Sequence, residues 1–103
     1  MEQTKTNRGF GLIEFEDFYG KKCSLQKSSI ATEDCIWLGI NDAEPIILAS
    51  QAAKLGISTK ETTGWINYPI PEEVSLHTRM HLSREQVAEL LPYLQMFVEI
   101  GDI

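Results

Sequence analysis

The residues best suited to bind an anion form a short basic row. His77, Arg79 and His81 occupy every second position of "SLHTRMHLS". On a β-strand, residues two apart point to the same face and lie about 6.6–7 Å apart, so these side chains would form a ladder. A guanidinium offers five donors in a planar fork that matches phosphate, and imidazoles add further donors. The row therefore predicts a site for a diphosphate or cyclic nucleotide, with a solvated outer strand face as the alternative interpretation.

The same spacing argues against a metal site. His77 and His81 are four residues apart, which on a strand is roughly 13 Å and too far for one ion to bridge. Two histidines beside a phosphodiester could act as general acid and base, so a phosphodiesterase or nuclease-like enzyme stays open as an alternative. No G-x-S-x-G elbow marks a nucleophile in the chain. We expect no catalytic residue, no metal and no cofactor.

A second candidate is a loop rich in hydroxyl groups. Gln26, Lys27, Ser28 and Ser29 lie at the end of an expected strand. Small donors beside a lysine can cup an anion. The spacing is not that of a P-loop, and a turn with local side-chain-to-backbone bonds is the alternative.

A third candidate combines an aromatic ring with an amide in "GWINYP". Trp65 and Asn67 are two apart, so an extended backbone points them the same way. The ring could stack on a base while the amide contacts the edge of that base. A rim aromatic that closes the core is the alternative for Trp65, and Trp37, inside an apolar run, is assigned to the core.

The composition limits the partners. The chain has 103 residues, and its formal net charge of −6 argues against general binding of DNA or RNA, which needs a basic surface. A local basic pocket for a small anion is compatible with that total. Cys23 and Cys35 form no CxxC pair and are expected as buried free thiols. No apolar run approaches the ~18–20 residues of a membrane span, and the first residues lack a signal-peptide core. We expect a cytoplasmic protein.

The elements that position these residues predict an α+β fold, a small antiparallel sheet with helices on one face. Strands are expected over 9–17, 21–26, 35–40 and 74–82, and an extended rim over 64–73. A short helix near the middle is predicted over 46–56 because of its alanines, although residues 46–49 could instead extend a strand.

The end of the chain predicts a long or kinked helix. Ser83 and Gln86 form a capping box, and Gly101 is the expected stop. Pro92 inside this helix removes one backbone bond and predicts a kink or a break into two pieces. We expect a flexible N-terminus over 1–8 and one domain over 9–103. A domain this small buries only about 60–65% of its unfolded surface, which favours an oligomer.

Several longer segments resemble a known family. They are "FEDFYGKKCSLQKSS", "IWLG", "LASQAAKLG", "GWINYPIPEEV" and "TRMHLSREQVAELLPYLQMFVEIGDI". With the patterns Y-G-x-x-C-S-L-Q-x-S-S and R-M-H-L-[ST], they resemble a widespread family of short bacteriophage and prophage proteins, over nearly the whole chain from about Gly9. The chain looks similar to the phage Thoeris anti-defence proteins that sequester cyclic ADP-ribose signals.

The resemblance implies a function without catalysis. Such proteins bind the nucleotide messenger made by bacterial TIR-domain enzymes and keep the host effector inactive, and related proteins also hold cyclic oligonucleotides at separate sites. The implied fold is an antiparallel sheet with C-terminal helices, assembled as dimers or higher oligomers. The ligand sits between subunits, gripped by arginine, asparagine and aromatic groups.

Carried over to this chain, the phosphate-binding arginine is Arg79. Lys27 takes a loop position where an arginine would fit better, and the aromatic and amide roles fall on Trp65 and Asn67. The leading hypothesis is thus a cyclic-nucleotide sponge acting in the infected bacterial host cell. Alternatives are a small phage protein that blocks a host enzyme by protein–protein binding, and a phosphodiesterase using His77 and His81.

Overall fold

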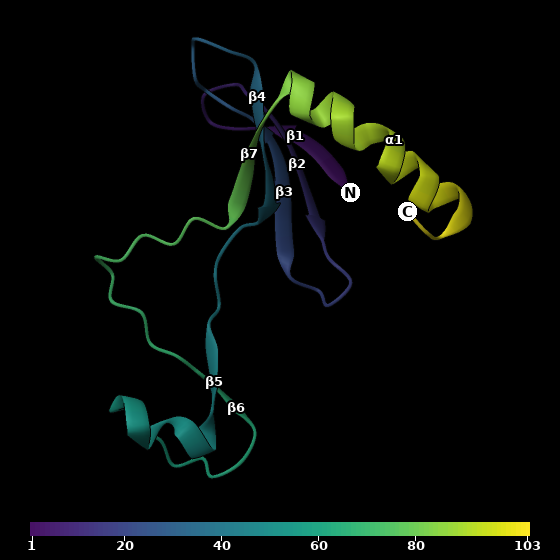
Figure 1. Cartoon of the computed structure of the whole chain (residues 1–103). Coiled ribbons are helices and arrows are strands. Elements are labelled where there is room, and N and C mark those ends of the chain that lie inside the picture. The colour runs from purple at the N-terminus through teal and green to yellow at the C-terminus, as the bar shows by residue number, and fades with distance from the viewer. The chain divides into compact units, whose positions relative to one another are not determined.

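A computed structural model describes all residues, 1–103 (Figure 1). The chain divides into two compact units. The first combines residues 1–41 with 78–103, and the second is 42–77. The second unit is therefore inserted between the two parts of the first.

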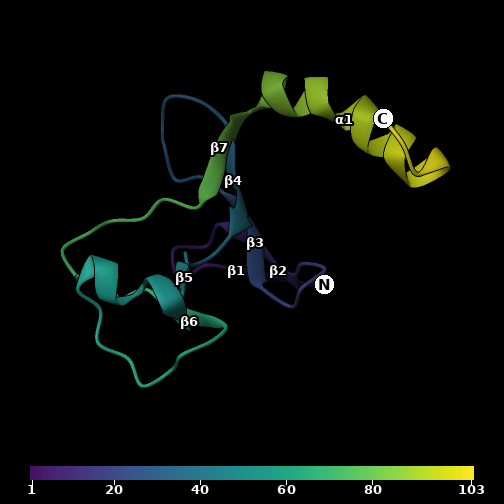
Figure 2. The ribbon, with the colours of Figure 1, turned by 60° about the horizontal axis from the view of Figure 1, so that its bottom comes forward.

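The first unit is built on a five-stranded antiparallel sheet in the order β1-β2-β3-β4-β7. The strands are β1 (Glu2–Lys5), β2 (Gly11–Glu16), β3 (Lys22–Lys27), β4 (Cys35–Ile40) and β7 (Arg79–Ser83). The predicted antiparallel sheet is confirmed, and Figure 2 shows β7 running beside β4. The edge strand β1 falls within the residues for which the sequence predicts a flexible terminus, and it pairs with β2 along its length.

The turn between β2 and β3 is fixed by an aspartate. Asp17 Oδ1 accepts hydrogen bonds from the backbone N–H groups of Tyr19 and Lys21, each at 2.9 Å. Gly20 takes the positive φ of 81° that this tight turn requires. The predicted hairpin at "DFYGKK" is therefore confirmed.

The register gives the sheet two unlike faces. Pairing aligns Ser24 with Gly39 and Gly39 with Arg79, and aligns Gln26 with Trp37 and Trp37 with His81. One face is therefore largely polar. The opposite face is apolar and includes Ile13, Phe15, Cys23, Leu25, Ile36, Leu38, Met80 and Leu82.

Strand β7 is shorter than predicted. Its pairing with β4 begins at Arg79, and residues 74–78 have no regular secondary structure. The cause is the length of the partner strand, since β4 ends at Ile40. Thr78 closes the ladder by donating its Oγ1 hydrogen to Ile40 O at 2.6 Å. His77 therefore lies outside the strand, and the predicted three-membered ladder is reduced to Arg79 and His81.

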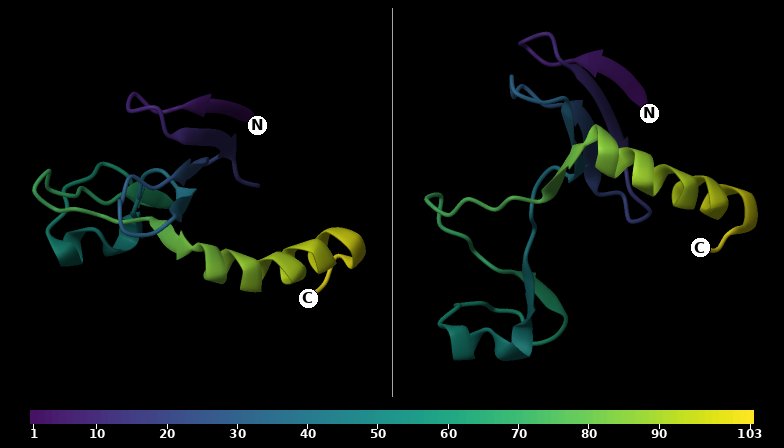
Figure 3. Two further views of the ribbon diagram at one scale, coloured as in Figure 1. Left: turned by 90° about the horizontal axis from the view of Figure 1, so that it is seen from above. Right: turned by 45° about the horizontal axis from the view of Figure 1, so that its top comes forward.

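The C-terminal helix α1 (Arg84–Ile100) follows directly from β7 (Figure 3). Its predicted capping box is confirmed, because Gln86 N donates to Ser83 Oγ at 3.2 Å and Ser83 N donates to Gln86 Oε1 at 2.9 Å. Pro92 lies inside one continuous helix, and Gly101 ends it with a φ of 72°.

The second unit contains a two-stranded antiparallel sheet, β5 (Ile46–Leu48) with β6 (Trp65–Asn67), and two 3₁₀ turns, η1 (Ala49–Gln51) and η2 (Ala53–Leu55). The predicted helix near the middle is therefore wrong. The β-branched start of the segment pairs with β6, and the residues left over are too few for a stable α-helix. Gly56 still acts as the stop, with a φ of 73°.

Two further expectations concern the cysteines and the membrane. Cys23 and Cys35 are both free and buried, as predicted. None of the helices has the length and apolar character needed to cross a bilayer.

Candidate functional site

The side chain of Arg79 crosses a neighbouring strand to reach the middle of the sheet. It starts on β7 opposite Gly39, and its Nη1 donates to Gln26 Oε1 at 2.9 Å and to Ser24 Oγ at 3.2 Å on β3. Gly39 has a φ of 149°, and a Cβ there would lie 3.0 Å from Thr78 O and 3.1 Å from Arg79 Cα. The crossing therefore depends on a strand position without a side chain.

The groups that hold this guanidinium are uncharged. Ser24 Oγ donates a hydrogen bond to Asn41 Oδ1 at 2.7 Å. Its lone pairs are therefore the groups that accept the hydrogen bond from Arg79. Hydroxyl and amide oxygens fix the direction of a guanidinium without neutralising its charge. Both bonds use Nη1, so the edge formed by Nε and Nη2 is the one that can pair bidentately with a phosphate or carboxylate.

An aromatic pair lies beside the guanidinium. The imidazole of His81 stacks on the indole of Trp37 with ring centroids 3.9 Å apart and an angle of 15° between the planes. The two residues are directly opposite in the β4–β7 register. Arg79 Cζ lies 5.6 Å from the Trp37 ring centroid, within range of a cation–π contact. Arg79, Trp37 and His81 thus form a cation next to a flat aromatic surface.

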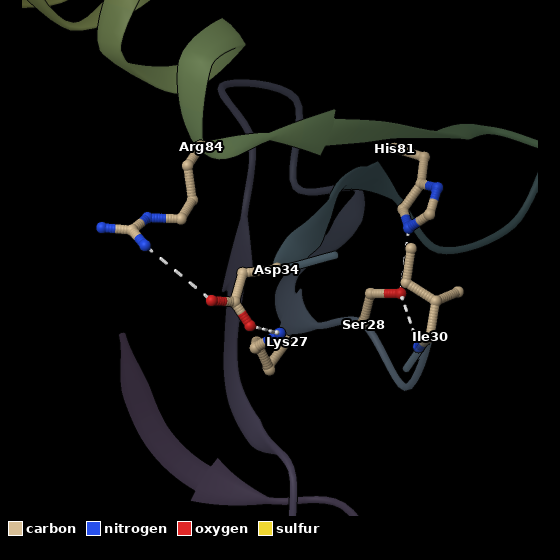
Figure 4. Close-up of polar contacts among 6 residues, drawn as sticks. All are labelled: Lys27, Ser28, Ile30, Asp34, His81 and Arg84. Atoms are coloured by element: carbon tan, nitrogen blue, oxygen red, sulfur yellow. Dashed lines mark hydrogen bonds and ion pairs between the residues drawn. The ribbon is translucent and has the colours of Figure 1, made fainter. Parts of the chain in front are cut away.

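Ser28 contacts the imidazole of His81 and lies below it in the view of Figure 4. His81 Nε2 is 2.9 Å from Ser28 Oγ, and this oxygen accepts from Ile30 N at 3.3 Å. A hydroxyl group can donate or accept, so this contact fixes the position of the ring for either tautomer of the imidazole. Ser28 is only 1% exposed, so its hydroxyl positions His81 and is poorly placed to attack a ligand.

Lys27 belongs to a different surface from Arg79. It pairs with Ile36 on the apolar side of the sheet, and its Nζ lies 3.2 Å from Asp34 Oδ1. Arg84 Nη1 approaches the other oxygen of Asp34 at 3.9 Å (Figure 4). The structure therefore separates Lys27 from the cation at Arg79 and gives it an acidic partner.

The remaining predicted residues are divided between the units. Ser29 is exposed and follows Ser28 in the first unit. Trp65 and Asn67 lie on β6 and are both exposed, with Ile66 between them less so, as their spacing predicts. His77 is exposed in the second unit, where its Nε2 lies 3.4 Å from Ser75 Oγ. Of the eight predicted residues, the structure brings together Arg79, His81 and Ser28.

Sequence reasoning missed the other half of the site. Trp37 is assigned to the core by its apolar neighbours, but the register places it with the polar residues on one face of the sheet. Ser24 was not considered and Gln26 was assigned to the loop rich in hydroxyl groups, although both alternate with Cys23 and Leu25 along β3. The polar residues that alternate along β3, together with Gly39 two residues after Trp37 in β4, were the sequence features that could have indicated a polar face of the sheet.

The residues do not gather into a metal site, since no group of three or more histidine, cysteine, aspartate or glutamate side chains is close enough to hold an ion. No protein-family model, curated protein or solved structure matches the chain.

Proposed function

We propose that the protein binds and sequesters a cyclic nucleotide signal without catalysis. The observation that supports this most directly is the charged edge of Arg79, held by neutral partners beside the Trp37–His81 pair. A phosphate needs a cation that is not already neutralised, and a base or ribose needs a flat surface. Both lie on one face of the sheet.

The polar face of the sheet around Arg79 carries groups that can hold a nucleotide without reacting with it. Charge-assisted hydrogen bonds contribute about 1.5–3 kcal/mol each, so a bidentate pair with Arg79 would supply much of the affinity for one phosphate. His81 would form a hydrogen bond to the ligand through Nδ1 or stack on a base. Ser29 is proposed as a further polar contact in the first unit, and Trp65, Asn67 and His77 are proposed as nucleotide contacts in the second unit.

The biological role comes from the resemblance to phage anti-defence proteins. It favours a cyclic ADP-ribose isomer as the ligand, with cyclic oligonucleotides as a second class. The protein would lower the free concentration of the messenger in the infected cell and so keep the host effector inactive. We propose that it does this as a homo-oligomer with ligand sites between subunits.

The direct test is capture and release. The protein is incubated with cyclic ADP-ribose isomers and with cyclic oligoadenylates, the filtrate is assayed for free ligand, and the protein is then heat-denatured. We expect ligand to disappear from the filtrate and to return intact. Folded protein that captures none of these compounds would contradict the proposal, and ligand returned in cleaved form would favour the phosphodiesterase.

A second candidate function rests on the β2–β3 turn. Phe18 and Tyr19 are 95% and 84% exposed, and their rings meet edge to face with centroids 5.3 Å apart. Exposed aromatic residues of this kind are common anchors of protein–protein interfaces. A phage protein that blocks a host enzyme could use them. Phe18→Ser with Tyr19→Ser would abolish such inhibition in infected cells and leave nucleotide capture unchanged.

A further inference from the structure

A small pocket lies at one end of the sheet, on the polar face that carries Arg79. It has a volume of about 340 Å³ and is formed by β2, β3 and the residue that follows β4. The register aligns Glu14 with Ser24, and Glu16, two residues further along β2, projects to the same face. The residues that line the pocket are Glu14, Phe15, Glu16, Lys22, Cys23 and Asn41.

Two hydrogen bonds connect this pocket to the guanidinium of Arg79. Asn41 Oδ1 accepts from Ser24 Oγ at 2.7 Å, and Ser24 Oγ accepts from Arg79 Nη1 at 3.2 Å. The backbone N–H of Asn41 donates to Lys22 O at 2.9 Å, which fixes Asn41 at the end of the sheet. Asn41 follows Gly39, the residue opposite Arg79, by two positions, which on a strand is about 6.6–7 Å. A phosphate on Arg79 would therefore bring the group attached to it next to the pocket.

The pocket offers both acceptors and donors of hydrogen bonds. Ionised Glu14 and Glu16 only accept, whereas Lys22 only donates. These three side chains are exposed, and no ion pair joins either carboxylate to Lys22. Because Asn41 Oδ1 already accepts from Ser24, the NH₂ group of this amide is the part that can donate to a ligand. Hydroxyl groups, which both donate and accept, match this set of side chains.

The charge of the pocket disfavours a second phosphate. Two carboxylates outnumber the single ammonium group of Lys22, so the pocket is net negative and repels an anion. An uncharged sugar meets no such repulsion, and a carboxylate that accepts from a ribose 2′-hydroxyl is a common feature of dinucleotide-binding sites. A base has its flat surface elsewhere, since Trp37 lies two residues before Gly39 and the pocket begins two residues after it.

We propose that this pocket binds the hydroxyl groups of a ribose whose phosphate is held by Arg79. This role rests on the proposed function and narrows its ligand to ribonucleotides. Glu14 accepts from the 2′-hydroxyl, because it lies directly opposite Ser24 and is the carboxylate nearest to the residues that hold Arg79. Lys22 and Asn41 donate to oxygens of the same sugar. A 2′-deoxyribose lacks the hydroxyl and leaves Glu14 without its partner.

The test compares cyclic ADP-ribose with two analogues, in which one ribose or the other carries hydrogen in place of its 2′-hydroxyl. All three compounds have the same charge, so titration calorimetry isolates the contribution of the hydroxyl. We expect one analogue to bind about tenfold more weakly than the parent, because one hydrogen bond to a charged acceptor is lost. Where cyclic di-adenylate is the compound captured, it is compared with its 2′-deoxy form. Equal affinity of parent and analogues would overturn the ribose pocket.

Two variants show whether the lost hydrogen bond belongs to the pocket. Glu14→Ala removes the acceptor and should bind the parent and the deoxy analogues with nearly equal affinity. Glu2→Ala is the matched control, since Glu2 lies opposite Glu14 on β1, outside the pocket, and carries the same charge. This control should keep the tenfold difference. A Glu14→Ala variant that also keeps it would place the hydroxyl elsewhere and reject the assignment.

The outcomes separate the ribose pocket from the proposed function. Folded protein that binds neither cyclic ADP-ribose nor cyclic di-adenylate contradicts both. Protein that captures one of these compounds equally well with and without the 2′-hydroxyl still sequesters a nucleotide and loses only the ribose pocket.

Discussion

Four neighbouring residues hold the guanidinium of Arg79 without cancelling its charge, which is the basis of the ligand-binding role proposed for it. Gly39 clears the path across β4, Gln26 and Ser24 accept from Nη1, and Trp37 lies 5.6 Å beneath the cation. By comparison, Lys27 is a half-buried cation whose amine is paired with Asp34. The difference between these two basic residues is one of position in the sheet, which composition alone does not reveal.

Replacing Arg79 by alanine tests its role directly. We expect Arg79→Ala to abolish nucleotide capture, because the bidentate contact to phosphate is lost, and to cost only about 1 kcal/mol of unfolding free energy, the net contribution of one or two hydrogen bonds. Titration calorimetry measures the first effect and urea unfolding the second. Lys27→Ala removes the same charge from the opposite face and should still bind. Equal loss of binding in both variants would point to a general charge effect.

Gly39 should be intolerant of even one methyl group. Gly39→Ala forces a Cβ to within 3.0 Å of Thr78 O and 3.1 Å of Arg79 Cα at a φ of 149°. Positive-φ strain of this kind costs of order 1–3 kcal/mol, and the crossing of Arg79 should be displaced as well. Gly11→Ala in β2 is the matched control, since a Cβ there meets nothing within 4 Å. Equal unfolding free energies for the two variants would show that the strand relaxes freely.

Among the elements, those governed by local sequence were predictable. The capping box at Ser83, the stop at Gly101 and the turn at Gly20 each depend on a few adjacent residues, and each was confirmed. The predictions that were wrong concern where a strand begins or ends, which depends on the length of the strand it pairs with. The strand expected over 74–82 begins only at Arg79 because β4 has no residue left to pair, and the helix expected near the middle gives way to β5 because β6 is its partner. Both outcomes depend on segments distant in sequence.

The N-cap of helix α1 is Ser83, and its contribution to the stability of the helix can be measured. Ser83→Ala removes the hydroxyl that accepts from Gln86 N, and losing an N-cap of this type costs about 0.5–2 kcal/mol. Ser83→Asp should retain most of the stability, because a carboxylate also caps an N-terminus. Urea unfolding followed by far-UV circular dichroism measures both. Ser29→Ala, at an exposed serine, is the control. A Ser83→Ala variant as stable as this control would mean that α1 is held by its packing rather than by its cap.

For the whole molecule, the sequence predicted the class of fold but only part of the candidate site. Arg79 and His81 could be found because the basic row alternates along one strand. Trp37 and Ser24 could not, and Gln26 was assigned to the wrong group, since the meeting of all three with Arg79 depends on the register of three strands. The division of the chain into two units was also hidden, because residues 42–77 contain strand and turn patterns like those of the rest.

The insertion of the second unit suggests that the first can fold without it. Gly39 pairs with Arg79, and Thr78 Oγ1 donates to Ile40 O, so the chain leaves and re-enters the sheet at adjacent points. Replacing residues 42–77 by a short glycine-containing turn should join β4 to β7 as a hairpin. We expect a folded variant with Trp37 as its one tryptophan, so that indole fluorescence reports on the sheet face.

Ligand binding by the shortened chain then shows which unit carries the site. If the phosphate contact belongs to Arg79, the variant should still capture nucleotide. Adding Arg79→Ala to the same background should remove what remains. A folded, shortened protein that binds nothing would place an essential contact in the second unit. Because Trp37 is then the only fluorophore of its kind, quenching on addition of nucleotide would report contact with the His81–Trp37 stack itself.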